Sequence, residues 1–210
     1  MTFSKKTTRR QFLYNTLIAG TGLLTLPNFV YASQDKHKTS DVDTFNAIWD
    51  KAQPLVVKNK KLAFSNLNTN EELELVYWSN GSYVKSALDR INQLFRDHRT
   101  DEVHVIDPNL LDLFYDLQQV LSTPEPLQLI SGFRSPDTNA MLRGKRKNSG
   151  VAKNSLHMIG KAADIRLPDK SIDQIYQTAV LMQRGGVGYY SGSNFVHVDV
   201  GNVRSWGKKE

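Results

Sequence analysis

The sequence predicts an α+β domain, and three observations support this prediction. Several short segments alternate apolar and polar residues, as half-buried strands do, and others repeat apolar residues at helical spacing. The two kinds of segment follow one another without a regular βαβ repeat. The 210 residues suit one good-sized core rather than two. We expect one domain over residues 70–207, preceded by a polar lead-in over residues 33–69.

The first half of this domain is predicted to contain a strand and two helices. Residues 73–78 alternate as a strand does, and the Asn80-Gly81 pair after them is typical of a turn. Residues 83–95 repeat apolar side chains at helical spacing. A second helix is expected to begin at Asp107-Pro108, where aspartate caps the first turn and proline occupies the first helical position. Its apolar positions continue to Leu121.

The second half is predicted to hold most of the strands. Two prolines within residues 123–126 separate it from the preceding helix. A helix is expected to begin at Ser135-Pro136, and another follows the capping box of Ser171 and Gln174. The expected strands cover residues 127–130, 163–167, 187–190 and 195–200.

The first 32 residues have the parts of an export signal. Arg9 and Arg10 precede Phe12-Leu13 and a modest apolar run, and small residues end at Ala32. The paired arginines predict a twin-arginine signal peptide over residues 1–32, cut after Ala32. An uncut signal anchor is the alternative, but the run is short and polar beside the ~20 apolar residues of a membrane span. We therefore expect a periplasmic chain without stable membrane insertion.

The residues available for chemistry are limited by the absence of cysteine. A metal site must therefore use histidine, aspartate or glutamate. His157 stands in a predicted loop, Asp164 begins a strand seven residues later, and His197 lies in the alternating strand 195–200. Two imidazoles and one carboxylate are a donor set that catalytic zinc takes while keeping a fourth position open. A histidine considered alone is more often structural.

The pattern around these residues resembles a known family. Three motifs are similar to those of the zinc D,D- and L,D-peptidases of bacterial cell walls. They are Ser155-x-His157-x-x-Gly160-x-Ala162-x-Asp164, the later His197-x-Asp199, and the stretch Ser131-Gly132-Phe133-Arg134-Ser135. The likeness is closest to the exported murein endopeptidase K group and covers residues 70–207. It implies a hedgehog/DD-peptidase-like fold with a small, mainly antiparallel sheet flanked by helices.

The resemblance also implies a function. We expect a Zn²⁺ ion on His157, Asp164 and His197, and hydrolysis of the stem-peptide cross-links of peptidoglycan. The implied link joins two diaminopimelate residues in an L,D bond. Two alternatives remain open: a D,D- or L,D-carboxypeptidase acting on the same substrate, and a peptidoglycan-binding protein without turnover.

Roles for the other motif residues follow from the resemblance. Arg134 would polarise the scissile carbonyl or bind a substrate carboxylate, and its alternative is a structural ion pair with a buried aspartate. Ser155 would contact substrate or cap a turn. Some relatives place an acidic general base three residues before the last zinc histidine, where this chain has Asn194. Asp199, on the same strand face as His197, is therefore the candidate base, or else a partner that orients His197.

Charge gives little support for nucleic acid as a partner. Outside the leader the chain holds 23 basic and 21 acidic residues, a balance too small for a nucleic-acid-binding protein. The densest basic run covers residues 143–147, with Lys153 beyond it. This run is either a solvated loop or a surface that attracts the carboxylates of peptidoglycan stems.

Overall fold

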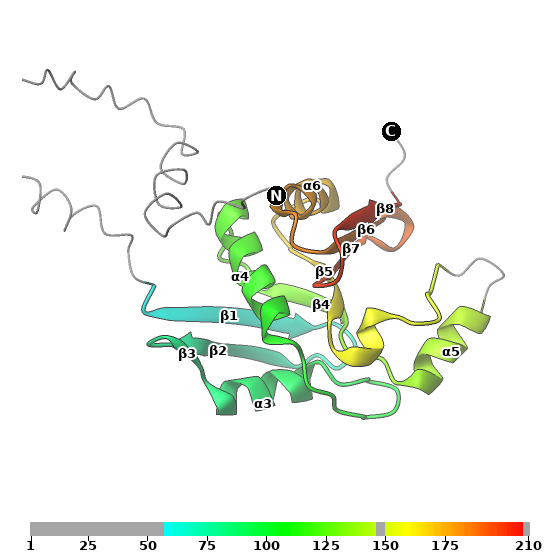
Figure 1. Ribbon diagram of the computed structural model, residues 1–210, viewed down its shortest axis with the longest axis horizontal. Helices are drawn as coiled ribbons and strands as arrows, with labels where there is room; N and C mark the ends of the chain where they lie inside the picture. Colours follow the sequence, from blue (N-terminus) through cyan, green and yellow to red (C-terminus); the bar gives the residue numbers. More distant parts are fainter. Residues whose placement is uncertain (1–56, 146–149, 208–210) are drawn as a thin grey trace, which may run out of the picture. The chain divides into compact units, whose positions relative to one another are not determined.

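A single mixed sheet runs through the domain in the order β3-β2-β1-β4-β5-β7-β6-β8 (Figure 1). The computed structural model describes residues 57–145 and 150–207, so the expected signal peptide lies outside the described residues. Two neighbouring pairs are parallel, β1 with β4 and β6 with β8, and the other pairs are antiparallel. The strands are β1 (Asn59–Asn66), β2 (Glu72–Ser79), β3 (Ser82–Tyr83), β4 (Leu127–Ser131), β5 (Ala162–Arg166), β6 (Gly186–Tyr190), β7 (Phe195–Asp199) and β8 (Arg204–Trp206).

Four α-helices in the described residues accompany the sheet, which confirms the predicted α+β class. They are α3 (Lys85–Leu94), α4 (Pro108–Leu121), α5 (Pro136–Gly144) and α6 (Ile172–Met182), with short 3-10 turns η1 (Leu156–Ile159) and η2 (Ser191–Ser193). Helix α3 packs against β2, α4 packs against β1 and α6, and α6 also covers β6 and β7 (Figure 1). Across the described residues, each helix is too short or too polar to cross a membrane.

Helices α4, α5 and α6 begin where the sequence predicts, whereas α3 begins at Lys85 because Tyr83, expected in that helix, lies in strand β3 and pairs with Trp78. The Asp107 carboxylate accepts a hydrogen bond from Asn109 N at 2.9 Å, ahead of Pro108 at the first helical position. Ser135 caps α5. The Ser171 side chain and Gln174 form the complete capping box of α6. These hydrogen bonds satisfy backbone amide groups that the first turn of a helix leaves unpaired, and so fix the residue at which each helix begins.

The core joins both halves of the sheet to the helices. Phe64 of β1 meets Phe95 edge-on at 5.1 Å between ring centres, and meets Phe114 of α4 at 6.0 Å. Under the other half of the sheet, Ile165, Val196 and Val198 are fully buried. These apolar residues alternate with polar ones along β5 and β7, so the polar side chains emerge together on the opposite face.

The sheet starts earlier in the chain than the sequence suggested. Residues 33–69 were expected to be a polar lead-in, but β1 (Asn59–Asn66) lies within the sheet between β2 and β4. Leu62 and Phe64 on this strand are only 1% exposed. Their alternation is hard to recognise because it covers only these two apolar residues and follows two consecutive lysines, Lys60 and Lys61. The ordered sheet therefore begins at Asn59, before the expected domain start at residue 70.

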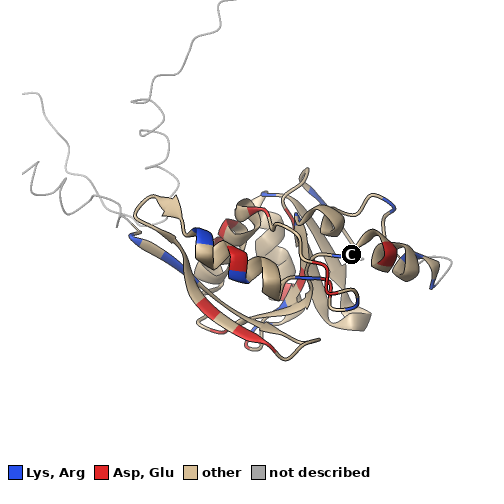
Figure 2. Ribbon diagram, turned by 90° about the horizontal axis from the view of Figure 1, so that it is seen from below, with Lys and Arg blue, Asp and Glu red and all other residues tan. Residues whose placement is uncertain are grey.

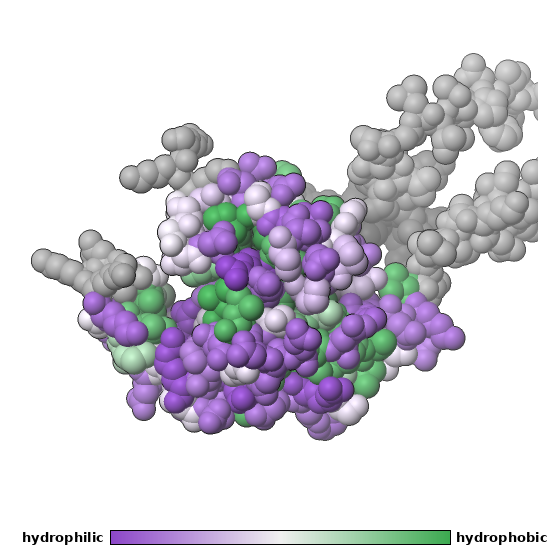
Figure 3. Space-filling view, turned by 180° about the vertical axis from the view of Figure 1, so that it is seen from behind, coloured by the Kyte–Doolittle hydropathy of each residue, from purple (hydrophilic) through white to green (hydrophobic). Residues whose placement is uncertain are grey.

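Charged residues of both signs are spread along the described chain (Figure 2), and one face of the protein is mainly polar (Figure 3). Figure 2 shows acidic and basic positions interspersed along the ribbon. The face drawn in Figure 3 is mainly hydrophilic, and its apolar areas are interrupted by polar ones. Such a surface is typical of a protein that meets water on this face.

Candidate metal centre

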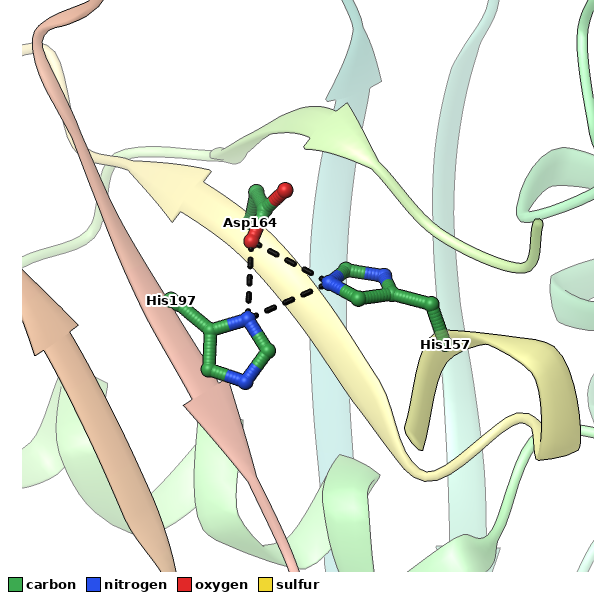
Figure 4. A group of neighbouring side chains, drawn as sticks. All are labelled: His157, Asp164 and His197. Atoms are coloured by element: carbon green, nitrogen blue, oxygen red, sulfur yellow. Dashed lines mark hydrogen bonds and ion pairs between the residues drawn. The ribbon is translucent and has the colours of Figure 1, made fainter. Parts of the chain in front are cut away.

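His157, Asp164 and His197 converge from three separate elements (Figure 4). His157 comes from η1, Asp164 from β5 and His197 from β7. Asp164 and His197 are direct partners in the antiparallel β5–β7 pair, so their side chains leave the sheet side by side. Asp164 Oδ1 lies 2.9 Å from His197 Nδ1 and 3.2 Å from His157 Nε2, and the two ring nitrogens are 3.1 Å apart. All three residues are buried.

A tight turn brings His157 to the sheet. The Ser155 side chain caps η1 by accepting a hydrogen bond from His157 N. Gly160 ends the turn with φ +66°, and a Cβ there would lie 2.0 Å from Val105 O. Only glycine fits this position without displacing backbone. Ser155 therefore has the capping role that the sequence left open, and it also lines the cleft described below.

The outward nitrogens of both rings are held by acceptors. His157 Nδ1 donates to Gly132 O at 2.7 Å, and His197 Nε2 donates to Asp199 Oδ2 at 3.1 Å. A carbonyl oxygen only accepts, so the neutral His157 ring carries its proton on Nδ1. Both nitrogens of His197 face carboxylate oxygens, with Asp164 Oδ1 2.9 Å from Nδ1 and Asp199 Oδ2 3.1 Å from Nε2. A metal ion at the cluster would replace a proton on Nδ1 and leave the proton on Nε2. The inward nitrogens, His157 Nε2 and His197 Nδ1, then carry lone pairs.

The inward atoms fit a divalent cation. Two lone pairs and a carboxylate oxygen lie within 4.8 Å of one another, which is unfavourable unless a positive charge lies between them. Two nitrogens and one oxygen are a set that zinc takes in catalytic sites, with one position left for another ligand. The two outer hydrogen bonds are the contacts that usually orient ligating histidines.

The pKa values are consistent with a cation site. Burial lowers the pKa of His157, which keeps that ring neutral and able to bind a metal. Burial works against ionisation of Asp164, but its interactions with the neighbouring His157 and Arg134 side chains hold its pKa well below the usual range. Burial also opposes a charge on His197, yet hydrogen bonds to Asp164 and Asp199 raise its pKa. A metal ion would replace that proton, so metal binding should weaken as pH falls.

Asp199 lies on the far side of His197 from the cluster. Its buried carboxylate accepts hydrogen bonds from His197, from the amides of Gly186 and Gly201 at 3.0 and 2.8 Å, and from Arg204 Nη2 at 2.6 Å. Burial opposes its ionisation, but these donors outweigh burial and lower its pKa. The contact with His197 Nε2 is the one that a partner orienting His197 would make, which was the alternative to a general base.

Arg134 forms an ion pair with the buried Asp164, which was the structural alternative to a role in binding substrate. Its Nη2 contacts Asp164 Oδ2, and its Nε donates to Ser131 Oγ at 2.8 Å. Its backbone N donates to His157 O at 3.2 Å, which ties the Arg134 segment to the turn that carries His157. Asp164 thus directs one oxygen to the histidines and the other to Arg134.

The cluster opens into a cleft of about 510 Å³. One part of its wall is aromatic: Tyr190 stacks on Phe195 with 4.6 Å between ring centres, and Trp206 Nε1 donates to Tyr190 Oη at 3.1 Å. The Trp206 ring lies 5.2 Å from the His197 ring. Asn194, three residues before His197, lines a different pocket together with Arg166.

Sequence reasoning missed two residues of this wall, Arg204 and Trp206. Both belong to β8, a three-residue strand that pairs in parallel with β6. The Arg204 guanidinium lies 5.2 Å from the centre of the Trp206 ring and also binds Asp199. A strand this short has almost no periodicity, so the Arg-x-Trp spacing was the only available signal.

Comparison with known proteins agrees with this geometry. The family described as "Peptidoglycan L,D-endopeptidase MepK" matches residues 55–206. The chain is 43% identical over 145 residues to the Peptidoglycan L,D-endopeptidase MepK of Escherichia coli (strain K12), covering 69% of this chain and 79% of that protein. It is 42% identical over 150 residues to the probable Peptidoglycan L,D-endopeptidase MepK of Haemophilus influenzae, covering 71% and 80%. The chain therefore belongs to the peptidoglycan L,D-endopeptidase MepK family.

Proposed function

We propose that this protein is a zinc-dependent peptidoglycan endopeptidase that hydrolyses the L,D link between two diaminopimelate residues. The observation that carries the proposal is the buried cluster of His157, Asp164 and His197 at a cleft, in a chain of this family. When bound, zinc would supply Lewis-acid activation of water and of the scissile carbonyl. Peptidoglycan is accordingly the proposed partner.

The residues around the cluster have distinct tasks in this proposal. His157, Asp164 and His197 would hold the metal, while Gly132 O and Asp199 keep the two rings oriented. Arg134, fixed by Asp164 and Ser131, would present its remaining N–H groups to a substrate oxygen. Among the described residues that line the cleft, Asp164 is the only carboxylate, and both its oxygens are engaged. The proton of the attacking water would then be accepted by a group other than a free carboxylate of the described cleft lining.

A carboxypeptidase is the second candidate, and Arg134 is the observation that favours it. A guanidinium beside the metal ligands could bind the terminal carboxylate of a stem peptide. Product masses separate the candidates after the zinc-loaded protein is incubated with purified cross-linked dimers. An endopeptidase converts dimers to monomers, a carboxypeptidase removes single residues, and a binding protein leaves the masses unchanged. We expect monomers.

We also propose that the protein reaches the periplasm by the twin-arginine route. The support is Arg9-Arg10 ahead of a weakly apolar run, in residues that lie outside the described structure. Changing both arginines to lysine should leave the precursor in the cytoplasm, because that pathway reads the arginine pair. Cell fractionation followed by immunoblotting measures the result. Mature protein at its normal level in the envelope fraction would refute this route.

A further inference from the structure

We propose that Arg99 forms a carboxylate-binding subsite that recognises the diaminopimelate residue on the acyl side of the scissile bond. The inference rests on the proposed function and adds to it a reason for the choice of cross-link. Arg99 lies in the segment between α3 and α4 and lines the same cleft as the metal cluster. Its side chain is exposed.

The cleft has more positive than negative side chains. Its described lining contains the cations Arg99, Arg134, Lys145 and Arg204, and the single carboxylate Asp164. Arg134 is paired with Asp164, and Arg204 is paired with Asp199. Within residues 57–145 and 150–207, Arg99 and Lys145 form no ion pair. An anionic group entering the cleft would therefore meet a cation that is not already neutralised.

A buried carboxylate fixes the backbone of Arg99 relative to the metal site. Asp97 is 1% exposed; its Oδ1 accepts from Arg99 N at 3.0 Å, and its Oδ2 accepts from Ser135 N at 2.9 Å. Ser135 directly follows Arg134, so one side chain anchors both arginine-bearing segments. A fixed backbone lowers the ordering cost of binding, because only the Arg99 side chain has to be immobilised.

The chemistry of the link explains what such a cation would bind. The amine-side carboxylate of a diaminopimelate link is one carbon from the scissile nitrogen, so it must lie close to the metal and to Arg134. The acyl-side diaminopimelate carries a second carboxylate, three methylene groups from the centre that forms the bond. In the described residues no hydrogen bond or ion pair joins Arg99 to the cluster, although both line the cleft, so we assign Arg99 to this second carboxylate. In a link whose acyl residue is alanine, a methyl group replaces that side chain and Arg99 would have no partner.

A binding experiment tests the subsite directly. The probes are the tripeptide L-alanyl-γ-D-glutamyl-meso-diaminopimelate and the same peptide amidated at the second centre of diaminopimelate. Titration calorimetry on the zinc-loaded protein should give about tenfold tighter binding of the free acid, as expected for a hydrogen bond to a charged group. Arg99→Gln should bind both probes equally. Arg99→Lys should keep part of the preference, because it retains the charge without the planar fork.

Arg90→Gln is the matched control. Arg90 is an exposed arginine of α3 outside the cleft, so its loss should leave the preference unchanged. Equal binding of the two probes by the unaltered protein, or a preference that survives in Arg99→Gln, would overturn the subsite. Cleavage of diaminopimelate-linked dimers is measured on the same preparations. Failure to cleave them would refute the proposed function, while the probe affinities would still decide the role of Arg99.

Discussion

Replacing His197 with alanine is expected to remove most of the bound zinc and most of the hydrolytic activity. His197 Nδ1 is one of the three inward ligand atoms, and its loss leaves two. Loss of an outer partner typically lowers metal affinity by about 10–100-fold, so loss of a ligand should lower it by at least that factor. Elemental analysis of the purified protein measures the zinc content, and product masses measure the activity.

A histidine outside the matched region provides the control for this variant. His37 lies outside residues 55–206, so His37→Ala should keep both zinc and activity. Near-ultraviolet circular dichroism verifies that each variant is folded. One zinc ion per folded His197→Ala chain would show that the metal is held elsewhere.

Asp199→Asn is expected to weaken zinc binding and to spare turnover at saturating zinc. The Asp199 carboxylate accepts the proton of His197 Nε2 and so orients the ring whose Nδ1 faces the metal. An amide keeps the shape of the side chain but lacks the negative charge. We expect zinc affinity to fall about 10–100-fold, the usual effect of losing such a partner. Zinc affinity and turnover are measured on one preparation.

The same variant distinguishes this role from the general-base role that the sequence suggested. A general base would leave zinc bound and lower kcat by about 10²–10⁴-fold. Asp112→Asn is the matched control, because Asp112 is a half-buried carboxylate that accepts from Lys60, Tyr77 and Tyr83 away from the cleft. It should affect the stability of the domain and leave zinc affinity unchanged. Unchanged zinc affinity in Asp199→Asn would contradict the orienting role.

Most of the secondary structure could be predicted because its signals are local. The Asp107-Pro108 start of α4 and the capping box at Ser171 depend only on adjacent residues, and the structure confirms both. Strand β1 was missed because Lys60 and Lys61 stand side by side, so the alternation is confined to Leu62 and Phe64. Strand β8 was missed because three residues contain too little pattern. Both strands are defined by their partners in the sheet, β2 and β4 for β1 and β6 for β8, rather than by their own residues.

The candidate site was predictable in composition and less so in geometry. The family motif pointed to His157, Asp164 and His197, which the structure brings together. Strand alternation correctly placed Asp199 on the face of His197. It could not show which ring nitrogen Asp199 binds, because that depends on the rotation of the imidazole and on Arg204 from another strand. The same limit applies to Arg134, whose pairing with Asp164 depends on how β4 and β5 meet.

Zinc-dependent hydrolysis is tested by measuring product masses after purified diaminopimelate-linked dimers are incubated with one protein preparation, either loaded with zinc or stripped of metal. The zinc-loaded protein should convert the dimers to monomers. The same protein treated with a chelator should leave them intact, and one equivalent of zinc should restore cleavage, because His157, Asp164 and His197 form a single site. Intact dimers after incubation with the zinc-loaded protein, or full cleavage by protein shown to be free of metal, would contradict the account.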